Sequence, residues 1–180
     1  MKKILPIILI VLVLFVTFAV FEELNKFDPK KKRLQCQEKT ITFEKIEFEN
    51  PIWETNNLIE TNNFVIKSNI EYSKFMKSHL MNILNVQQAD DILNKILKQY
   101  IKSDKPNNKK LEIDYYIYEN DKEDKGKKGA KSKLYAGYLV FEFKLEGKVV
   151  YKIQTDYMNI DGNDIEERMN CVVKSFLSIK

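Results

Sequence analysis

Two stretches of alternating hydrophobicity in the second half of the sequence constrain the fold more than any other feature. Leu111–Glu119 carries an apolar or aromatic residue at every second position, and Leu134–Tyr157 repeats this pattern on both sides of a turn. Successive side chains of a strand point to opposite faces, so each stretch predicts strands with one buried face. We therefore expect a sheet in which Leu134–Tyr157 forms a β-hairpin.

The burial pattern also predicts the turn of this hairpin. Leu145, Glu146 and Gly147 are expected to form a three-residue turn in which Gly147 takes the left-handed conformation. The resulting apolar pairs would share one face: Phe143 with Val149, Phe141 with Tyr151, and Leu139 with Ile153. A two-residue turn at Glu146 and Gly147 would pair apolar with polar side chains, so the pattern favours the longer turn.

Helical periodicity occupies three segments: Ser68–Leu84, Asn85–Ile101 and Asn163–Phe176. Apolar residues recur every three or four positions in each, which is the spacing of one helix face. Each segment also opens with a side chain that can cap a helix, followed three residues later by Glu or Gln. We expect three helices, each with an apolar stripe that has to be covered.

The remaining segments predict one more strand and two connections. Ile41–Phe48 alternates, but the parity changes after Phe43, which predicts a bulge or a bend. Asn50–Asn63 predicts an irregular connection anchored by Trp53. Glu119–Lys133 predicts a mobile loop, because twelve of its fifteen residues are charged or glycine.

This order of elements predicts the α+β class: a small antiparallel sheet of about four strands with three helices packed on it. One N-terminal transmembrane or signal-anchor helix is expected to precede the sheet. The predicted organisation has three parts: residues 1–21 as the transmembrane or signal-anchor segment, 22–39 as a basic stalk, and 40–180 as a single α+β domain.

The opening segment, MKKILPIILIVLVLFVTFAVF, predicts the compartment. Its apolar run Ile4–Phe21 has 18 residues, which is long enough to span a bilayer and longer than the usual core of a cleaved signal peptide. We expect a single-pass protein of a bacterial inner membrane with a periplasmic domain. Cleavage near Ala19 would instead give a periplasmic or secreted protein. The basic residues after the run leave a cytoplasmic orientation open.

Two features of the sequence bear on this location. Cys36 and Cys171 are its only two cysteines, a count typical of one disulfide in an exported protein, with two unrelated thiols as the alternative. A run of four basic residues, Lys30, Lys31, Lys32 and Arg33, precedes the domain. This run is expected either to contact anionic headgroups at the membrane surface or to form a solvated stalk.

The sequence contains little that resembles catalytic or cofactor chemistry. Its one histidine, His79, is expected on the apolar face of its helix, and no metal, cofactor or nucleophile motif is present. We therefore expect no enzyme, no cofactor and no metal. The 30 basic residues are balanced by 26 acidic ones, and a nucleic-acid binder would concentrate its positive charge, so we expect no nucleic-acid partner.

Three tyrosines form the candidate partner surface. Tyr116, Tyr118 and Tyr138 fall on strand faces opposite the apolar ones, and tyrosine is common where a half-wet surface meets a partner. The sequence thus predicts a non-enzymatic binding or assembly module of the bacterial envelope, whose partner is another envelope protein or a lipid. The alternatives are a secreted or periplasmic inhibitor or immunity-type binder, and a small hydrolase that uses paired carboxylates.

Overall fold

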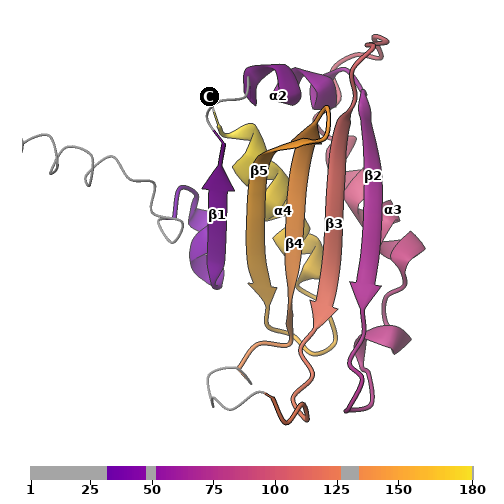
Figure 1. The fold of residues 1–180 in the computed structure, drawn as a ribbon, viewed down its shortest axis with the longest axis vertical. Coiled ribbons are helices and arrows are strands. Elements are labelled where there is room, and N and C mark those ends of the chain that lie inside the picture. Colours follow the sequence, from indigo (N-terminus) through magenta and orange to yellow (C-terminus); the bar gives the residue numbers. More distant parts are fainter. Residues whose placement is uncertain (1–31, 48–51, 127–133, 180) are drawn as a thin grey trace, which may run out of the picture.

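The computed structural model describes residues 32–47, 52–126 and 134–179. These residues form an α+β fold, as predicted, around a five-stranded sheet (Figure 1). The predicted antiparallel sheet of four strands is wrong in two respects, because there are five strands and the β2–β3 pair is parallel. The expected N-terminal transmembrane or signal-anchor helix lies outside the described residues. Within the described ranges, no helix combines the length and apolar character needed to span a bilayer.

The sheet has the strand order β1-β5-β4-β3-β2. Its strands are β1 (Thr42–Ile46), β2 (Phe64–Glu71), β3 (Leu111–Glu119), β4 (Gly137–Leu145) and β5 (Lys148–Tyr157). The helices are the 3₁₀ turns η1 (Gln35–Lys39) and η2 (Leu80–Asn82), and the α-helices α2 (Ile52–Glu60), α3 (Val86–Leu97) and α4 (Ile165–Leu177). Helices α3 and α4 cover one face of the sheet, and α2 lies at the end where β2 and β3 begin (Figure 1).

The core lies between this covered face and the two helices. Phe143 of β4 stacks on Phe176 of α4 with 4.0 Å between ring centroids, and Tyr151 of β5 lies 5.7 Å from both rings. All three side chains are fully buried. The inward positions of β3 and β4 follow the predicted alternation, so these strands were correctly predicted.

The capping patterns identified two of the three helices. Asn85 caps α3 as predicted: its side chain accepts from the Gln88 backbone N–H, and the Gln88 side chain accepts from that of Asn85. Helix α4 was also predicted, but its N-cap residue is Asp164 instead of Asn163. The Asp164 carboxylate accepts from the backbone N–H groups of Met158 and Asn159, which joins the end of β5 to the start of the helix.

The predicted helix Ser68–Leu84 is wrong. Its first residues belong to β2, which runs parallel to β3 over eight residue pairs, and the remainder contains only the short turn η2. The ladder hydrogen bonds to β3 outweigh the local helical spacing, because a strand in a buried sheet gains partners that the sequence does not reveal. His79 accordingly lies exposed, not on an apolar helix face.

Two further elements differ from prediction near the N-terminal side. The segment expected to be irregular contains helix α2, in which Leu58 and Ile59 are buried while Trp53 is 73% exposed and anchors nothing. Strand β1 has no bulge; it alternates regularly, with Glu44 on the buried face. A glutamate in that position breaks the apolar pattern of the sequence, and its partners are described below.

The hairpin turn is shorter than predicted. Glu146 and Gly147 form a two-residue turn with φ values of 50° and 79°, and Leu145 lies opposite Lys148. A register shift next to Phe143 then places this residue opposite Tyr151. The bulge restores the matching of the two apolar faces, but the predicted pairs are wrong by two residues: Phe141 lies opposite Ile153 and Leu139 opposite Thr155.

Candidate functional site

The face of the sheet opposite α3 and α4 is the candidate functional surface. No helix of the described ranges lies over it (Figure 1). Its side chains divide into two groups along the strands. Tyrosines gather where β3 ends and β4 begins, whereas charged residues occupy the opposite half.

The three predicted tyrosines meet in one cluster, which we call the tyrosine patch. Tyr118 of β3 lies directly opposite Tyr138 of β4, and their rings stack with centroids 4.7 Å apart. Tyr116 meets Tyr138 edge to face at 6.1 Å. All three side chains are half-buried, so the rings already hold one another in place and keep one side open to solvent.

Burial and neighbouring groups shift the pKa values of ionisable groups in and beside this patch. Burial raises the pKa of Tyr138, and the nearby Tyr116, Tyr118 and Glu71 raise it further, so its hydroxyl stays protonated. Across the next strand pair, Tyr138 lies opposite Asp156. Burial raises the pKa of Asp156 to about 6, despite opposing contributions from Gln154 and Lys32.

A surface pocket of about 830 Å³ adjoins the tyrosine patch. Tyr118 belongs to both, and the pocket continues along Asn69 and Glu71 of β2 to Tyr72 and Phe75 beyond it. Phe75 is 66% exposed. A partly apolar hollow beside a set of ordered rings is suited to receive side chains of a partner.

Two buried carboxylates hold residues 73–80, the segment whose first residues, Ser73, Lys74 and Phe75, line this pocket. Glu119 accepts hydrogen bonds from four donors of this segment: the backbone N–H groups of Ser73, His79 and Leu80, and the Ser78 hydroxyl. Asp121 accepts from the backbone N–H groups of Lys74, Phe75 and Met76. Burial disfavours both charges, but the donors outweigh it and hold the pKa of each carboxyl below its usual range.

Sequence reasoning missed these two residues, because it assigned Glu119–Lys133 to a mobile loop. Residues 127–133 lie outside the described residues, but Glu119 and Asp121 are buried and ordered. Glu119 continues the inward alternation of β3. A carboxylate at an inward position of a strand is the signal that could have identified it, because buried charges need partners.

The other half of this face carries a network of ion pairs. Lys144 contacts Asp114 at 2.6 Å and Glu142 at 3.0 Å, and Lys152 contacts Glu142 at 2.6 Å. These interactions raise the pKa of Lys144 and lower that of Glu142. Because opposite charges alternate across the strands, this half offers no extended patch of one sign.

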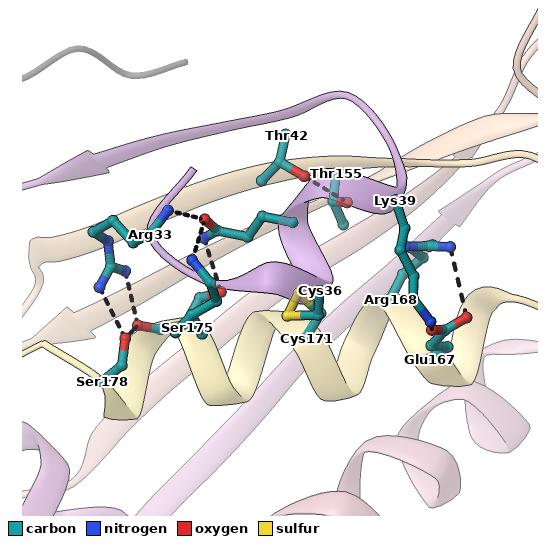
Figure 2. The surroundings of a disulfide bond; sticks show 12 residues. Arg33, Cys36, Lys39, Thr42, Thr155, Glu167, Arg168, Cys171, Ser175 and Ser178 are labelled. Carbon is teal, nitrogen blue, oxygen red and sulfur yellow. Dashed lines mark hydrogen bonds and ion pairs between the residues drawn. A yellow bond between two sulfur atoms is a disulfide. The ribbon is translucent and has the colours of Figure 1, made fainter. Parts of the chain in front are cut away.

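The two cysteines lie on the covered side of the sheet, away from the tyrosine patch, where η1 meets α4. Cys36 of η1 and Cys171 of α4 form a disulfide with 5.8 Å between their Cα atoms (Figure 2). This bond joins positions 135 residues apart. The first described element is thereby attached to the last.

A polar network beside the disulfide explains the buried glutamate of β1. The Arg33 guanidinium donates to both oxygens of Glu44, at 2.6 and 2.8 Å. It also donates to the Ser175 carbonyl and the Ser178 hydroxyl (Figure 2). The Tyr151 hydroxyl donates to the same carboxylate at 2.6 Å. Glu44 is therefore buried together with its donors.

This network changes the interpretation of the basic run. Arg33 is bound to Glu44, and the Lys32 ammonium donates to the Thr42 carbonyl at 2.7 Å. These two residues pack on the domain instead of standing free on a stalk. Lys30 and Lys31 lie outside the described residues.

Across the described ranges, no three His, Cys, Asp or Glu side chains are grouped so that they could hold a metal ion. Fold and surface together define an α+β protein with one open, tyrosine-bearing sheet face.

Comparisons with known proteins found similarity to solved structures alone. No protein-family model and no curated protein matches the sequence. Two crystal structures of the PelC dodecamer from Paraburkholderia phytofirmans, one of a single-substitution variant, are 11% identical to this chain, with TM-scores of 0.39 and 0.38. They cover 77% of this chain, which matches 98% and 97% of theirs.

Proposed function

We propose that this chain is a non-enzymatic binding module of the bacterial envelope. In this proposal Ile4–Phe21 anchors it in the inner membrane, the domain lies in the periplasm, and another envelope protein docks on the tyrosine patch. The single observation that carries the proposal is the patch itself: three half-buried rings in mutual contact beside a pocket.

The chemistry of the open face favours a protein as the partner. Tyrosine rings supply a large contact area with little entropy to lose, and the contacts within the patch already restrict them. A nucleic acid would require a stripe of unpaired positive charge. On this face Lys144 and Lys152 are paired with acidic neighbours instead.

The disulfide supports an extracytoplasmic location. Disulfides persist in oxidising compartments such as the periplasm and are rare in the cytosol. The bond between Cys36 and Cys171 closes a long loop and lies beside a buried polar network. An arrangement of this kind is typical of a structural disulfide.

The two buried carboxylates that hold residues 73–80, Glu119 and Asp121, favour binding over hydrolysis. A general acid needs a raised pKa and a free oxygen that faces the substrate. Glu119 and Asp121 have lowered pKa values, and their oxygens accept hydrogen bonds from residues 73–80. They stabilise the pocket wall and are poorly suited to transfer protons.

Site-specific photo-crosslinking in intact cells tests the docking surface. Benzoylphenylalanine in place of Tyr118 or Tyr138 should capture the same protein, while the same label at Gln87, exposed on α3, should not. The second substitution Tyr138→Ser should abolish the adduct formed from position 118. Identical adducts from all three positions, or none from the patch, would contradict the proposal.

An intact mass of the protein recovered from membranes tests its location. We expect the full-length mass, with both thiols resistant to alkylation until a reductant is added. A mass shortened near Ala19 would indicate a released factor, as in the inhibitor or immunity-type alternative. Free, reactive thiols would indicate a cytoplasmic domain.

A further inference from the structure

The two edge strands of the sheet, β1 and β2, differ in how their free backbone groups are satisfied (Figure 1). The Ile41 carbonyl accepts from the Asp156 N–H of β5, so the backbone groups of the next residue, Thr42, point away from the sheet. The Thr42 carbonyl accepts there from the Lys32 ammonium at 2.7 Å. The N-terminal segment thus covers part of this edge, which has five residues.

The edge of β2 is longer and has no such cover among the described residues. The Leu111 N–H of β3 donates to the Asn63 carbonyl, and the backbone groups of successive strand residues point alternately to the two sides. The residues whose groups point away from β3 are therefore Phe64, Ile66, Ser68 and Ile70. No hydrogen bond joins these backbone groups to another residue that the structure describes. β2 contains no proline and no bulge, which are features that often protect an edge strand.

Helix α3 leaves this edge accessible in the plane of the sheet. Its Asp90 carboxylate accepts from the Ser68 hydroxyl of β2 at 3.0 Å and from the Tyr115 hydroxyl of β3 at 2.8 Å. The helix therefore lies behind β2 and β3, on the covered face (Figure 1). An added strand would extend the sheet beyond β2.

The side chains of β2 on the open face indicate which strand fits this edge. Lys67 and Glu71 are both exposed. Lys67 contacts Glu112 of β3 at 2.6 Å, whereas Glu71 forms no ion pair with a residue that the structure describes. An antiparallel strand with a basic residue four positions before an acidic one would place an opposite charge directly across from each. β2 itself has this pattern, so a second copy of the chain fits the edge.

We propose that two copies of this chain pair through β2 in antiparallel orientation, with Asn69 opposite Asn69 of the second copy. This register places Lys67 of each copy opposite Glu71 of the other. A pairing centred on Lys67 would oppose two lysines, and one centred on Ser68 would place Val65 opposite Glu71. The charges therefore select the register centred on Asn69.

The resulting dimer has one continuous sheet. Its hydrogen bonds join Ser68 of each copy to Ile70 of the other, because the free backbone groups of both residues point outward. The two-fold axis is perpendicular to the sheet, so both tyrosine patches lie on one face. Glu71 also lines the pocket beside the tyrosine patch, and the second copy would add Lys67 to the rim of that pocket. This pairing goes beyond the proposed function, since it requires neither the anchor nor another envelope protein.

Cysteine cross-linking of the full-length protein tests the register. Cys36 and Cys171 are disulfide-bonded, so an introduced cysteine is the only free thiol. Asn69→Cys would place two cysteines opposite each other in a non-hydrogen-bonded pair, with Cα atoms about 4.5 Å apart, a distance that a disulfide spans. Val65→Cys is the matched control, because Val65 is exposed on the same face of β2, but the two copies of position 65 would lie about 27 Å apart.

Membranes that contain each variant are treated with copper phenanthroline and separated on a non-reducing gel. We expect a disulfide-linked dimer for Asn69→Cys and none for Val65→Cys. Equal yields at both positions, or an adduct of Asn69→Cys with another protein, would overturn the proposal. Absence of the dimer at position 69 would also overturn it, and would show that Lys67 keeps the edge unpaired, as lysines on edge strands often do.

An exchange of charges separates the proposed pairing from chance collisions. In the Asn69→Cys variant, Lys67→Glu should slow dimer formation about tenfold, because both cross-strand pairs become repulsive. The further substitution Glu71→Lys should restore the rate, while circular dichroism shows that all variants are folded. A rate that Lys67→Glu leaves unchanged, or that Glu71→Lys does not restore, would overturn the proposal. The photo-adducts from Tyr118 and Tyr138 test the proposed function separately.

Discussion

The two faces of the same sheet carry aromatic rings for different purposes. On the covered face, Phe143 and Tyr151 pack against Phe176 and are fully buried. On the open face, Tyr118 and Tyr138 also stack, with ring centroids 4.7 Å apart, but remain half-exposed. Neighbouring residues of one strand thus contribute either to the core or to the open surface, depending on the face of the sheet to which each side chain points.

Stacked aromatic rings alone therefore do not identify the core of the protein. The free energy of a ring contact depends mainly on the apolar area that leaves water, and only the covered face has helices to remove it. Substitutions on the covered face should therefore affect folding, and those on the open face should affect binding.

The largest effect is expected from a matched pair of truncations. Phe143→Ala should lower the free energy of unfolding by about 3–5 kcal/mol, because it leaves a cavity against Phe176. Tyr138→Ala should cost about 1 kcal/mol, the scale of one aromatic pair. Urea titrations of both variants measure the difference. Equal losses would show that the open face is part of the core.

Removal of the disulfide should have the next largest effect. Cys36→Ser with Cys171→Ser should cost about 2–4 kcal/mol, because the unfolded chain gains the entropy of an open loop. The bond fastens η1 to α4, which covers the inner face. Thermal unfolding with and without reductant provides the measurement, and the double variant, insensitive to reductant, is the control. A melting temperature of the wild type that is the same with and without reductant would contradict the prediction.

Glu119→Gln should cost about 1–3 kcal/mol at neutral pH, because an amide has one oxygen to accept the donors of residues 73–80. The folded-state pKa of Glu119 is lowered, so its contribution is present above the unfolded pKa of about 4.3 and is lost as pH falls through the folded value.

Urea midpoints at pH 6 and pH 3 measure this dependence. The difference in stability between wild type and Glu119→Gln should shrink as the pH falls. A difference that is constant over this range would show that the charge of Glu119 contributes nothing.

The smallest effect is expected in the ion-pair network of the open face. Lys152→Gln should change stability by less than about 0.5 kcal/mol, because solvent screens an exposed pair. Lys144→Gln should cost more, since Lys144 is less exposed and contacts Asp114 and Glu142. The free energies of unfolding of both variants, measured in low and in high salt, show which substitution costs more stability. A larger loss for Lys152 would show that this network supports the fold.

How far the sequence predicted this molecule depended on the range of the interactions involved. Strand β3, the cap of α3 and the apolar positions of α4 were predicted correctly, because each depends on a pattern among residues close together in the sequence. The tyrosines of the candidate surface were assigned to one face for the same reason. Strand β2 and helix α2 were missed, since their burial depends on β3 and the core.

The candidate site shows the same limit. Parity alone assigned Tyr116, Tyr118 and Tyr138 to the open face, but their mutual contact depends on the β3–β4 register. The pocket beside them depends on Glu119 and Asp121 accepting hydrogen bonds from a segment 39 to 47 residues earlier. Residue types near Glu119 resemble a solvated loop, so no local pattern indicated those hydrogen bonds.

Local pattern specified the α+β class, the faces of β3, β4 and β5, and the helix that starts after Asn85. Tertiary structure decided the parallel pairing of β2, the burial of Glu44 with Arg33, and the two-residue turn with its bulge. The physical reason is one of range: alternation and capping act between near neighbours, whereas backbone ladders and buried charges are satisfied by partners distant in sequence.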